Sequence, residues 1–325
     1  MPDVATTVPK SAPGEHHLTQ HKFGDHAFKW LTLLMALSVF VLIVLIGYEL
    51  AHGSTLALKK FGWRFLVSSD WDPVNEQFGA LPFIFGTLVS SAIALVIAVP
   101  LSVASAVFLT EMAPRWLRQP LTIFIELLSA VPSVILGLWG IFVMVPWLRE
   151  HLFPWLKSTL GFLPLFQGPI YGVSMLAGGI ILAIMIIPII TSVSREIIRS
   201  VPGLQREAAY ALGATRWEVT RIAVLSYAKK GLFGATILGL GRALGETMAV
   251  TMVIGNRPEI AKSLFAPGYT LASVVANEFT EATTDLYLHA LFELGLVLLG
   301  VTILVNALAQ LLLKTLGGPG VKGQR

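Results

Sequence analysis

The sequence predicts an all-α polytopic membrane protein with six transmembrane helices. Of its 325 residues, 55% are hydrophobic and only 13% are charged, whereas soluble domains carry roughly 25% charged residues. A helix needs about 20 mostly apolar residues to cross a bilayer, and six segments of this chain are long enough. They lie at residues 29–50, 82–109, 121–147, 171–194, 231–254 and 287–313.

The first segment sets the organisation of the chain. It carries no charge from Trp30 to Tyr48, and the polar stretch before it holds both signs of charge. This pattern favours a retained span over a cleaved signal peptide. Prolines at the ends of or inside later spans are expected to kink them. The predicted organisation is a disordered cytosolic tail (1–28), the first transmembrane helix with an external segment (29–81), a five-helix core (82–313) and a cytosolic tail (314–325).

The distribution of basic residues predicts the orientation. The tails and the loops 110–120 and 195–230, counted with Lys29 at the edge of the first span, together hold 15 Lys and Arg, whereas the loops on the opposite side hold 7. Cytosolic loops carry the excess of Lys and Arg. We therefore expect both termini and the loop 195–230 in the cytosol.

That basic loop contains a short helical pattern. Residues Glu207 to Gly213 read Glu-Ala-Ala-Tyr-Ala-Leu-Gly. Pro202 suits the start of a helix, and Gly213 can adopt the left-handed conformation that ends one. Thr215 and Glu218 match a capping box that would start a second helix. By themselves these residues fit either an ordinary amphipathic loop helix or a docking hook.

The fifth segment carries two charges inside an apolar run. Arg242 lies 12 residues after Lys230, which is roughly 18 Å along a helix and therefore near the middle of a bilayer. A charge at that depth costs about 2.5–3.5 kcal/mol, so it should face a cavity or a partner. Glu246 would lie one turn further on the same helix face. Gly241 and Gly245 should let another helix approach closely.

Two interpretations of these charges stay open. Arg242 and Glu246 can form a buried pair that only locks helices together. Alternatively, the guanidinium fork of Arg242 can bind an oxyanion in transit, with Glu246 holding the arginine and tempering its affinity.

The Glu207–Gly213 motif resembles the EAA loop of ATP-binding-cassette (ABC) importer permeases, although Ala223 and Ser226 stand where that family has Ile and Pro. Further blocks, spread from about Phe61 to Leu308, resemble phosphate importer permeases of the PstC type. These blocks are Trp71-Asp72, Gly79–Leu81, Gly86–Val89, Ile125–Ser133, Gly137–Gly140, Leu182–Pro188, Gly239–Val250, Val253–Asn256 and Ala276–Phe279.

The resemblance implies a type I ABC importer permease in the bacterial plasma (inner) membrane. A second related permease, two cytosolic ATPase subunits and an external phosphate-binding protein would be its partners. The substrate path would include Arg242 and Glu246, and the ATPase would dock on Glu207, Ala208, Ala209 and Gly213. Alternatives are a permease for molybdate, sulfate or phosphonate, or a self-contained anion channel or secondary carrier.

Other classes of function find no support in the residues. The chain has no Gly-x4-Gly-Lys-Ser/Thr run, so ATP hydrolysis should reside in a partner chain. We expect no catalytic residue, metal, cofactor or nucleic-acid partner, and membrane lipid as the surroundings. The four histidines His16, His17, His21 and His26 fit a solvated tail better than a metal site. Glu126 and Glu293 lie near the ends of spans and should reach the interface.

Overall fold

The computed structural model describes residues 22–316, with side chains placed from 26 to 314. Within that range there is no β-strand, and the only bridges join Asp72 to Gln77 and Gly255 to Gly268. The all-α prediction is therefore confirmed. Residues 1–21, with His16, His17 and His21 of the predicted tail, and residues 317–325 lie outside the described residues. The fourth histidine of that tail, His26, lies within a described helix.

The chain divides into two compact units, Met1–Tyr48 and Glu49–Arg325. The described part of the first unit belongs to helix α1 (Lys22–Gly53), whose apolar side chains are exposed. The helix begins at Lys22, so residues 22–28 are helical although the sequence analysis assigned them to the tail.

Five stretches of the described chain are long and apolar enough to cross a membrane, or six if one bent pair counts as a single span. This agrees with the six predicted segments, although the third and fifth have different bounds. The stretches are His26–Gly53, Leu81–Met112, Ser133–Leu160, Met175–Arg199, Asp285–Lys314 and the bent pair Arg216–Leu244 with Met248–Ile254.

The third predicted span, 121–147, is not one helix. Helix α5 (Arg115–Ala130) ends before Val131, which is extended with ψ 126°. The ring of Pro132 disfavours the helical conformation in the residue before it. Helix α5 buries none of its side chains, and the apolar stretch runs instead from Ser133 to Leu160. It comprises α6 (Ser133–Trp139), α7 (Val145–Trp147) and α8 (Phe153–Leu160), joined by π-helical turns at Gly140–Met144 and Leu148–Leu152.

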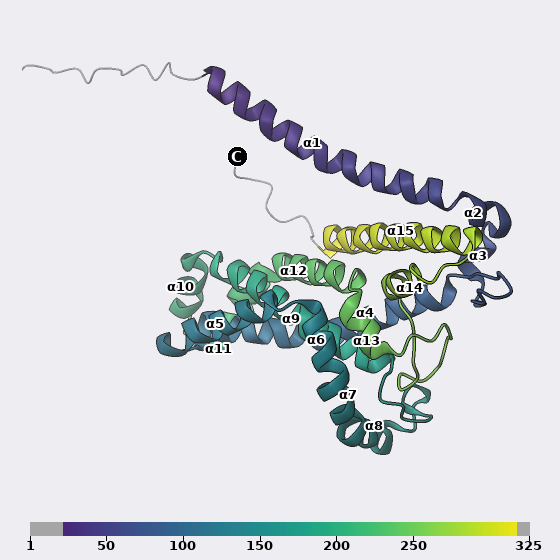
Figure 1. The fold of residues 1–325 in the computed structure, drawn as a ribbon. Coiled ribbons are helices and arrows are strands. Elements are labelled where there is room, and N and C mark those ends of the chain that lie inside the picture. Colours follow the sequence, from purple (N-terminus) through teal and green to yellow (C-terminus); the bar gives the residue numbers. More distant parts are fainter. Residues whose placement is uncertain (1–21, 317–325) are drawn as a thin grey trace, which may run out of the picture. The chain divides into compact units, whose positions relative to one another are not determined.

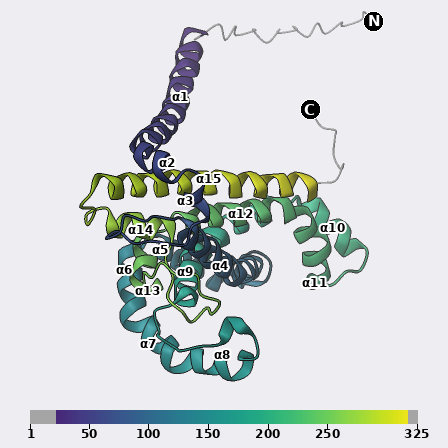
Figure 2. The ribbon, with the colours of Figure 1, turned by 90° about the vertical axis from the view of Figure 1, so that its right-hand side faces the viewer.

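The core of the second unit forms where α4 (Leu81–Val107) packs along α9 (Met175–Arg199). Helix α12 (Ser226–Leu244) covers α9 and also contacts α15 (Asp285–Leu316), which lies beside it in Figures 1 and 2. Helix α12 approaches α9 closely at Gly231 and Gly239, where an added Cβ would lie 2.6 Å from the side chains of Ile197 and Ile190, respectively. These glycines therefore let the two helices meet.

Several short helices mark the two ends of this unit. Helices α10 (Gly203–Ala211) and α11 (Arg216–Glu218) lie at one end, and α14 (Leu271–Glu278) lies at the other, as Figures 1 and 2 show. At the α14 end, α2 (Thr55–Phe61) and α3 (Arg64–Val67) lead into the segment before α4. Two loops that were predicted to lie on opposite sides of the membrane, 195–230 and 255–286, are thus found at opposite ends.

A polar clasp holds the α14 end together. The Trp71 indole donates to Glu278 Oε2 at 2.8 Å, and the Tyr287 hydroxyl donates to the same oxygen at 2.6 Å. Nearby, the side-chain amide of Asn75 donates to Asp72 and lowers the pKa of that carboxyl below its ordinary value. The segment between α3 and α4 is therefore hydrogen-bonded to α14, which is itself bonded to α15, and it has an ordered turn of its own.

Candidate functional site

The helix that carries the two predicted membrane charges is broken between them. Helix α12 ends at Leu244, and α13 (Met248–Ile254) starts at an angle of 67° to it. The prediction of a continuous helix over 231–254 is thus wrong. Gly245 is a weak helix former, and the carboxylate of Glu246 accepts from the Ala249 N–H at 3.3 Å. That bond satisfies an N–H that would otherwise have no partner at the start of α13.

The break still brings the two charges together. Arg242 Nη1 lies 2.6 Å from Glu246 Oε2, with side-chain exposures of 43% and 3%. The contact is ionic, because Glu246 Oε2 has no partner in hydrogen-bond geometry within the described residues. The buried Glu246 carboxylate therefore attracts the guanidinium by charge, and the guanidinium N–H groups stay available to other acceptors.

The exposed side of Arg242 lines an open cavity of about 550 Å³. An added Cβ at Gly241 would meet no atom within 4 Å, and at Gly245 only a carbonyl oxygen of its own helix at 3.8 Å. Within the second unit no atom of another helix lies within 4 Å of these two Cβ positions, so the predicted close approach of another helix stays a prediction. The cavity is lined by Ile189, Gly234, Ile237, Leu238, Gly241, Arg242 and Asn306.

Asn306 is a residue of this site that was not identified from the sequence. This residue lies on α15, on the wall of the cavity that holds Arg242. Its amide nitrogen donates to the Thr302 carbonyl at 2.9 Å, which orients the side chain and leaves a second N–H. An amide inside an apolar span is a signal that could have identified it, because polar residues in spans often line functional cavities.

The helical hook has the local structure that the sequence predicted. Helix α10 follows Pro202 as its N-cap, and Gly213 has φ +81° just after its end. Thr215 Oγ1 accepts from the Glu218 N–H at 3.4 Å, and the Glu218 carboxylate accepts from the Thr215 N–H at 2.7 Å. The capping box is therefore confirmed.

The outer surface of the hook is apolar. Leu204 and Leu212 are 75% and 90% exposed. With the exposed Ala208 between them, they follow a spacing of four residues and so share one helix face. Glu207 is exposed beside this face, whereas Ala209 is half-buried. The sequence analysis named the EAA residues but missed the two leucines.

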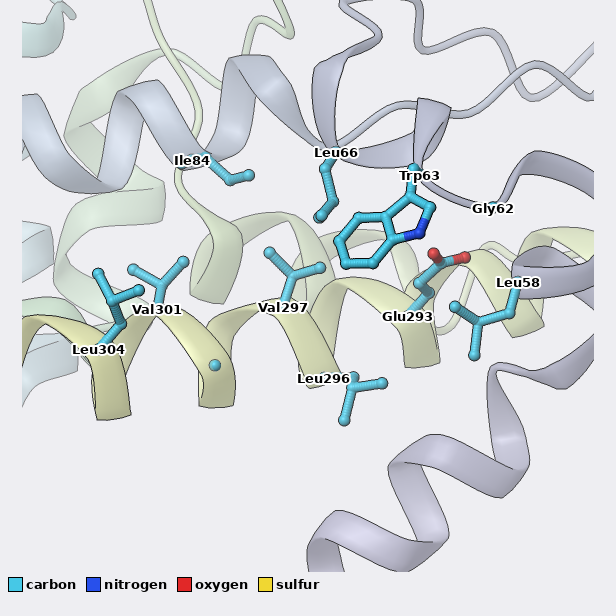
Figure 3. A pocket seen from close by; sticks show the side chains of 11 residues that line it. Leu58, Gly62, Trp63, Leu66, Ile84, Glu293, Leu296, Val297, Val301 and Leu304 are labelled. Atoms are coloured by element: carbon cyan, nitrogen blue, oxygen red, sulfur yellow. The ribbon is translucent and has the colours of Figure 1, made fainter.

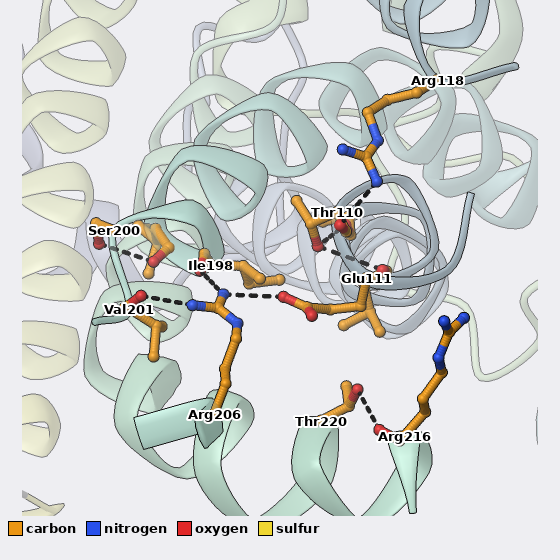
Figure 4. A network of polar contacts seen from close by, with 12 residues as sticks. Thr110, Glu111, Arg118, Ile198, Ser200, Val201, Arg206, Arg216 and Thr220 are labelled. Atoms are coloured by element: carbon orange, nitrogen blue, oxygen red, sulfur yellow. Dashed lines mark hydrogen bonds and ion pairs between the residues drawn. The ribbon is translucent and has the colours of Figure 1, made fainter. Parts of the chain in front are cut away.

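An arginine that the sequence analysis also missed attaches the hook to the core. Figure 4 shows the Arg206 guanidinium reaching from α10 to three acceptors. It donates to the carbonyls of Val201 and Ile198 at 2.6 and 3.0 Å and to Glu111 Oε1 at 2.9 Å. Glu111 follows α4, in the turn Phe108–Met112. The hook is thus bonded to the end of α9 and to the end of α4.

The two glutamates expected at the interface differ. Glu126 is exposed and pairs with Arg195 at 3.3 Å, so its place at the interface stays a prediction. Glu293 is only 3% exposed, so its carboxylate is turned into the protein, contrary to the expectation. The apolar neighbours contributed by α2 and α3 could not be located from the sequence.

The described residues combine an all-α fold, five or six candidate spans and a capped helical hook, which is the architecture of a polytopic membrane protein. Residues 98–317 match the family described as binding-protein-dependent transport system inner membrane component, and the chain belongs to that family. It is therefore an inner-membrane subunit of a transport system of this kind.

Named relatives cover nearly the whole chain. It is 49% identical to the phosphate transport system permease protein PstC of Haemophilus influenzae over 293 residues, which are 89% of this chain and 93% of that protein. The PstC of Mesorhizobium japonicum is 48% identical over 89% of this chain and 90% of its own length. A probable PstC of Methanocaldococcus jannaschii is 36% identical over 88% and 93%.

Solved structures share the fold. A chain of a bacterial alginate ABC transporter, in complex with a periplasmic protein bound to an alginate pentasaccharide, aligns with a TM-score of 0.60 at 16% identity. The alignment covers 92% of this chain and 99% of that one. A second structure of a bacterial ABC transporter that imports alginate gives a TM-score of 0.55 at 17% identity and covers 88% and 97%. The fold is that of an ABC importer permease.

Proposed function

We propose that this chain is the membrane permease of an ATP-driven phosphate importer and that Arg242 contacts the anion during passage. The names of the relatives support phosphate as the substrate. The observation that carries the proposal is the half-exposed Arg242 guanidinium on a cavity wall, backed by the buried Glu246. A guanidinium presents N–H donors in a planar fork that suits a tetrahedral oxyanion.

The negative charge of Glu246 allows the anion to dissociate from Arg242. A unit charge about 4 Å from a guanidinium is held by about 4 kcal/mol at an effective dielectric constant of about 20. The fixed carboxylate of Glu246 offsets part of that attraction, so phosphate binds Arg242 weakly enough to move on. Asn306 supplies an additional N–H on the same wall. Both features suit a residue on a path rather than a storage site.

The hook couples this chain to ATP hydrolysis by a partner ATPase. Glu207, Ala208, Ala209 and Gly213, with the exposed leucines beside them, form the surface on which a cytosolic ATPase docks. ATP binding by two such subunits moves α10, and the Arg206 contacts transmit that motion to α4 and α9. Alternating access follows, together with a second related permease and an external phosphate-binding protein. Both chain termini lie in the cytosol in this arrangement.

A double substitution distinguishes a role of Arg242 in anion passage from a purely structural role. Arg242→Gln alone leaves a buried carboxylate without its cation, so it damages the protein under either interpretation. Arg242→Gln with Glu246→Gln leaves two neutral amides, which are much easier to bury. We expect this double variant to assemble with its partner subunits while uptake of radiolabelled phosphate stays near background. Arg242→Lys keeps the charge but loses the fork, so it should be partly active at best.

A matched control removes the same two charges elsewhere. Arg257 and Glu259 form an exposed pair at 3.1 Å, with exposures of 56% and 61%. The double variant Arg257→Gln with Glu259→Gln should transport phosphate normally. Near-normal phosphate uptake by a well-assembled Arg242→Gln, Glu246→Gln variant would refute the passage role and leave the pair as a clamp. Uptake of sulfate or molybdate instead of phosphate by the wild-type system would refute the assignment of phosphate as the substrate.

A further inference from the structure

A second cavity lies away from Arg242, between α15 and the elements before α4. It is an apolar groove of about 720 Å³. Figure 3 shows Leu66 and Ile84 facing Val297 and Val301 of α15, with Leu58 at the end of the groove near Glu293. Trp63 stands at its edge and is 85% exposed.

One charged side chain interrupts this apolar lining. Glu293 is 3% exposed, and its Oε2 has no hydrogen-bond partner within the described residues. Figure 3 shows the carboxylate pointing into the groove beside the Trp63 indole. A buried polar group without a partner is costly, and ionisable groups within spans are typical of functional sites. A ligand that donates N–H groups would supply the hydrogen-bond partner that this carboxylate lacks.

The dimensions of the groove match one leaflet of a bilayer. Glu293 directly precedes a charge-free run of 20 residues, 294–313, which is about the length that crosses the hydrocarbon core. The lining continues from Glu293 to Leu304, 11 residues further, which is roughly 16 Å along the helix. One leaflet of hydrocarbon is about 15 Å thick, half of the bilayer core. The acidic end of the groove thus lies toward the membrane surface, and its apolar end extends toward the midplane.

We propose that this groove binds one phospholipid with a primary ammonium headgroup, phosphatidylethanolamine. The ammonium donates to the Glu293 carboxylate, and an acyl chain lies along Val297, Val301 and Leu304. Charge complementarity selects this headgroup. A trimethylated phosphatidylcholine headgroup has no N–H to donate, and the carboxylate repels the anionic phosphatidylglycerol. This inference requires only that the chain is embedded in a membrane, so it does not depend on the proposed substrate.

Native mass spectrometry of the intact transporter tests the assignment. The complex is extracted in mild detergent and supplied with equal amounts of palmitoyl-oleoyl phosphatidylethanolamine, phosphatidylcholine and phosphatidylglycerol. We expect wild type to retain phosphatidylethanolamine about tenfold better than the others, as suits a charge-assisted hydrogen bond. Glu293→Gln should lose that preference. Glu281→Gln removes the same charge from an exposed side chain and should keep it.

A second variant keeps the proposal testable if the Glu293→Gln variant does not assemble. An added Cβ at Gly300, which lines the groove, would meet no atom within 4 Å. Gly300→Leu should therefore fill the groove without disturbing the fold and lower the retention of all three lipids. Equal retention of the three lipids by wild type, or a preference that survives in Glu293→Gln, overturns the proposal.

The alternative occupant is a helix of another subunit. The chain contains no cysteine, so a single cysteine can report on the groove. Leu304 lines it and is 59% exposed. Efficient crosslinking of Leu304→Cys to a partner subunit in the assembled complex would show that a protein helix fills the groove and would also overturn the lipid assignment. Labelling by a lipid-borne crosslinker supports it.

Discussion

Replacing Arg206 with methionine should loosen the hook from the core. Methionine keeps an apolar stem of similar reach and removes the guanidinium. Three hydrogen bonds disappear, to Val201, Ile198 and Glu111. The ion pair to Glu111 is well covered, with side-chain exposures of 23% and 18%. Breaking a buried pair by removing one partner typically costs about 3–5 kcal/mol, and we take about 3 kcal/mol because this pair is partly exposed.

Amide hydrogen exchange measures that cost directly. A loss of about 3 kcal/mol in local stability corresponds to exchange over residues 203–211 that is on the order of 100-fold faster. In the assembled transporter, phosphate uptake per ATP hydrolysed should fall, because hook motion no longer reaches Glu111.

Arg199→Met is the matched control. The Arg199 side chain makes one exposed pair with Glu196 at 3.3 Å, with exposures of 46% and 63%. Exposed pairs contribute about 0–1 kcal/mol, so exchange in this variant should change only a few-fold. Equal exchange over residues 203–211 in Arg206→Met and Arg199→Met would refute the role given to the Arg206 contacts.

Three further predictions test other parts of the chain. Gly213 has φ +81° and open space around its Cβ position, so Gly213→Val should cost about 1–2 kcal/mol through the backbone alone and weaken ATPase association in a pull-down. Gly213→Asn should be tolerated, and equal association of the two variants would contradict this reasoning. Gly241→Leu should fill the Arg242 cavity, abolishing phosphate uptake while assembly on size-exclusion chromatography stays normal; retained uptake would place the path elsewhere. In intact cells, Ser69→Cys should react with an impermeant thiol reagent and Thr215→Cys should not, and the reverse pattern would exclude cytosolic termini.

The sequence by itself determined the features that depend on neighbouring residues. The start of α10 after Pro202, its left-handed end at Gly213 and the capping box of Thr215 with Glu218 were all predicted. Each is a contact or a backbone preference within a few positions along the chain. The number of apolar segments was predicted for the same reason, since the length of a span is a property of consecutive residues.

Tertiary structure decided how distant segments meet. Arg206 and Glu111 are 95 positions apart, and no local pattern joins them. The sequence placed Arg242 and Glu246 on one face of a continuous helix, but packing of α13 against α6 and α9 accompanies the break that sets their pairing and exposes Arg242 to a cavity. Glu293 became a buried carboxylate because α2 and α3 contribute apolar neighbours from far along the chain. Burial and pairing of charges depend on the whole fold, because every element around a charged group changes its access to water and to a partner.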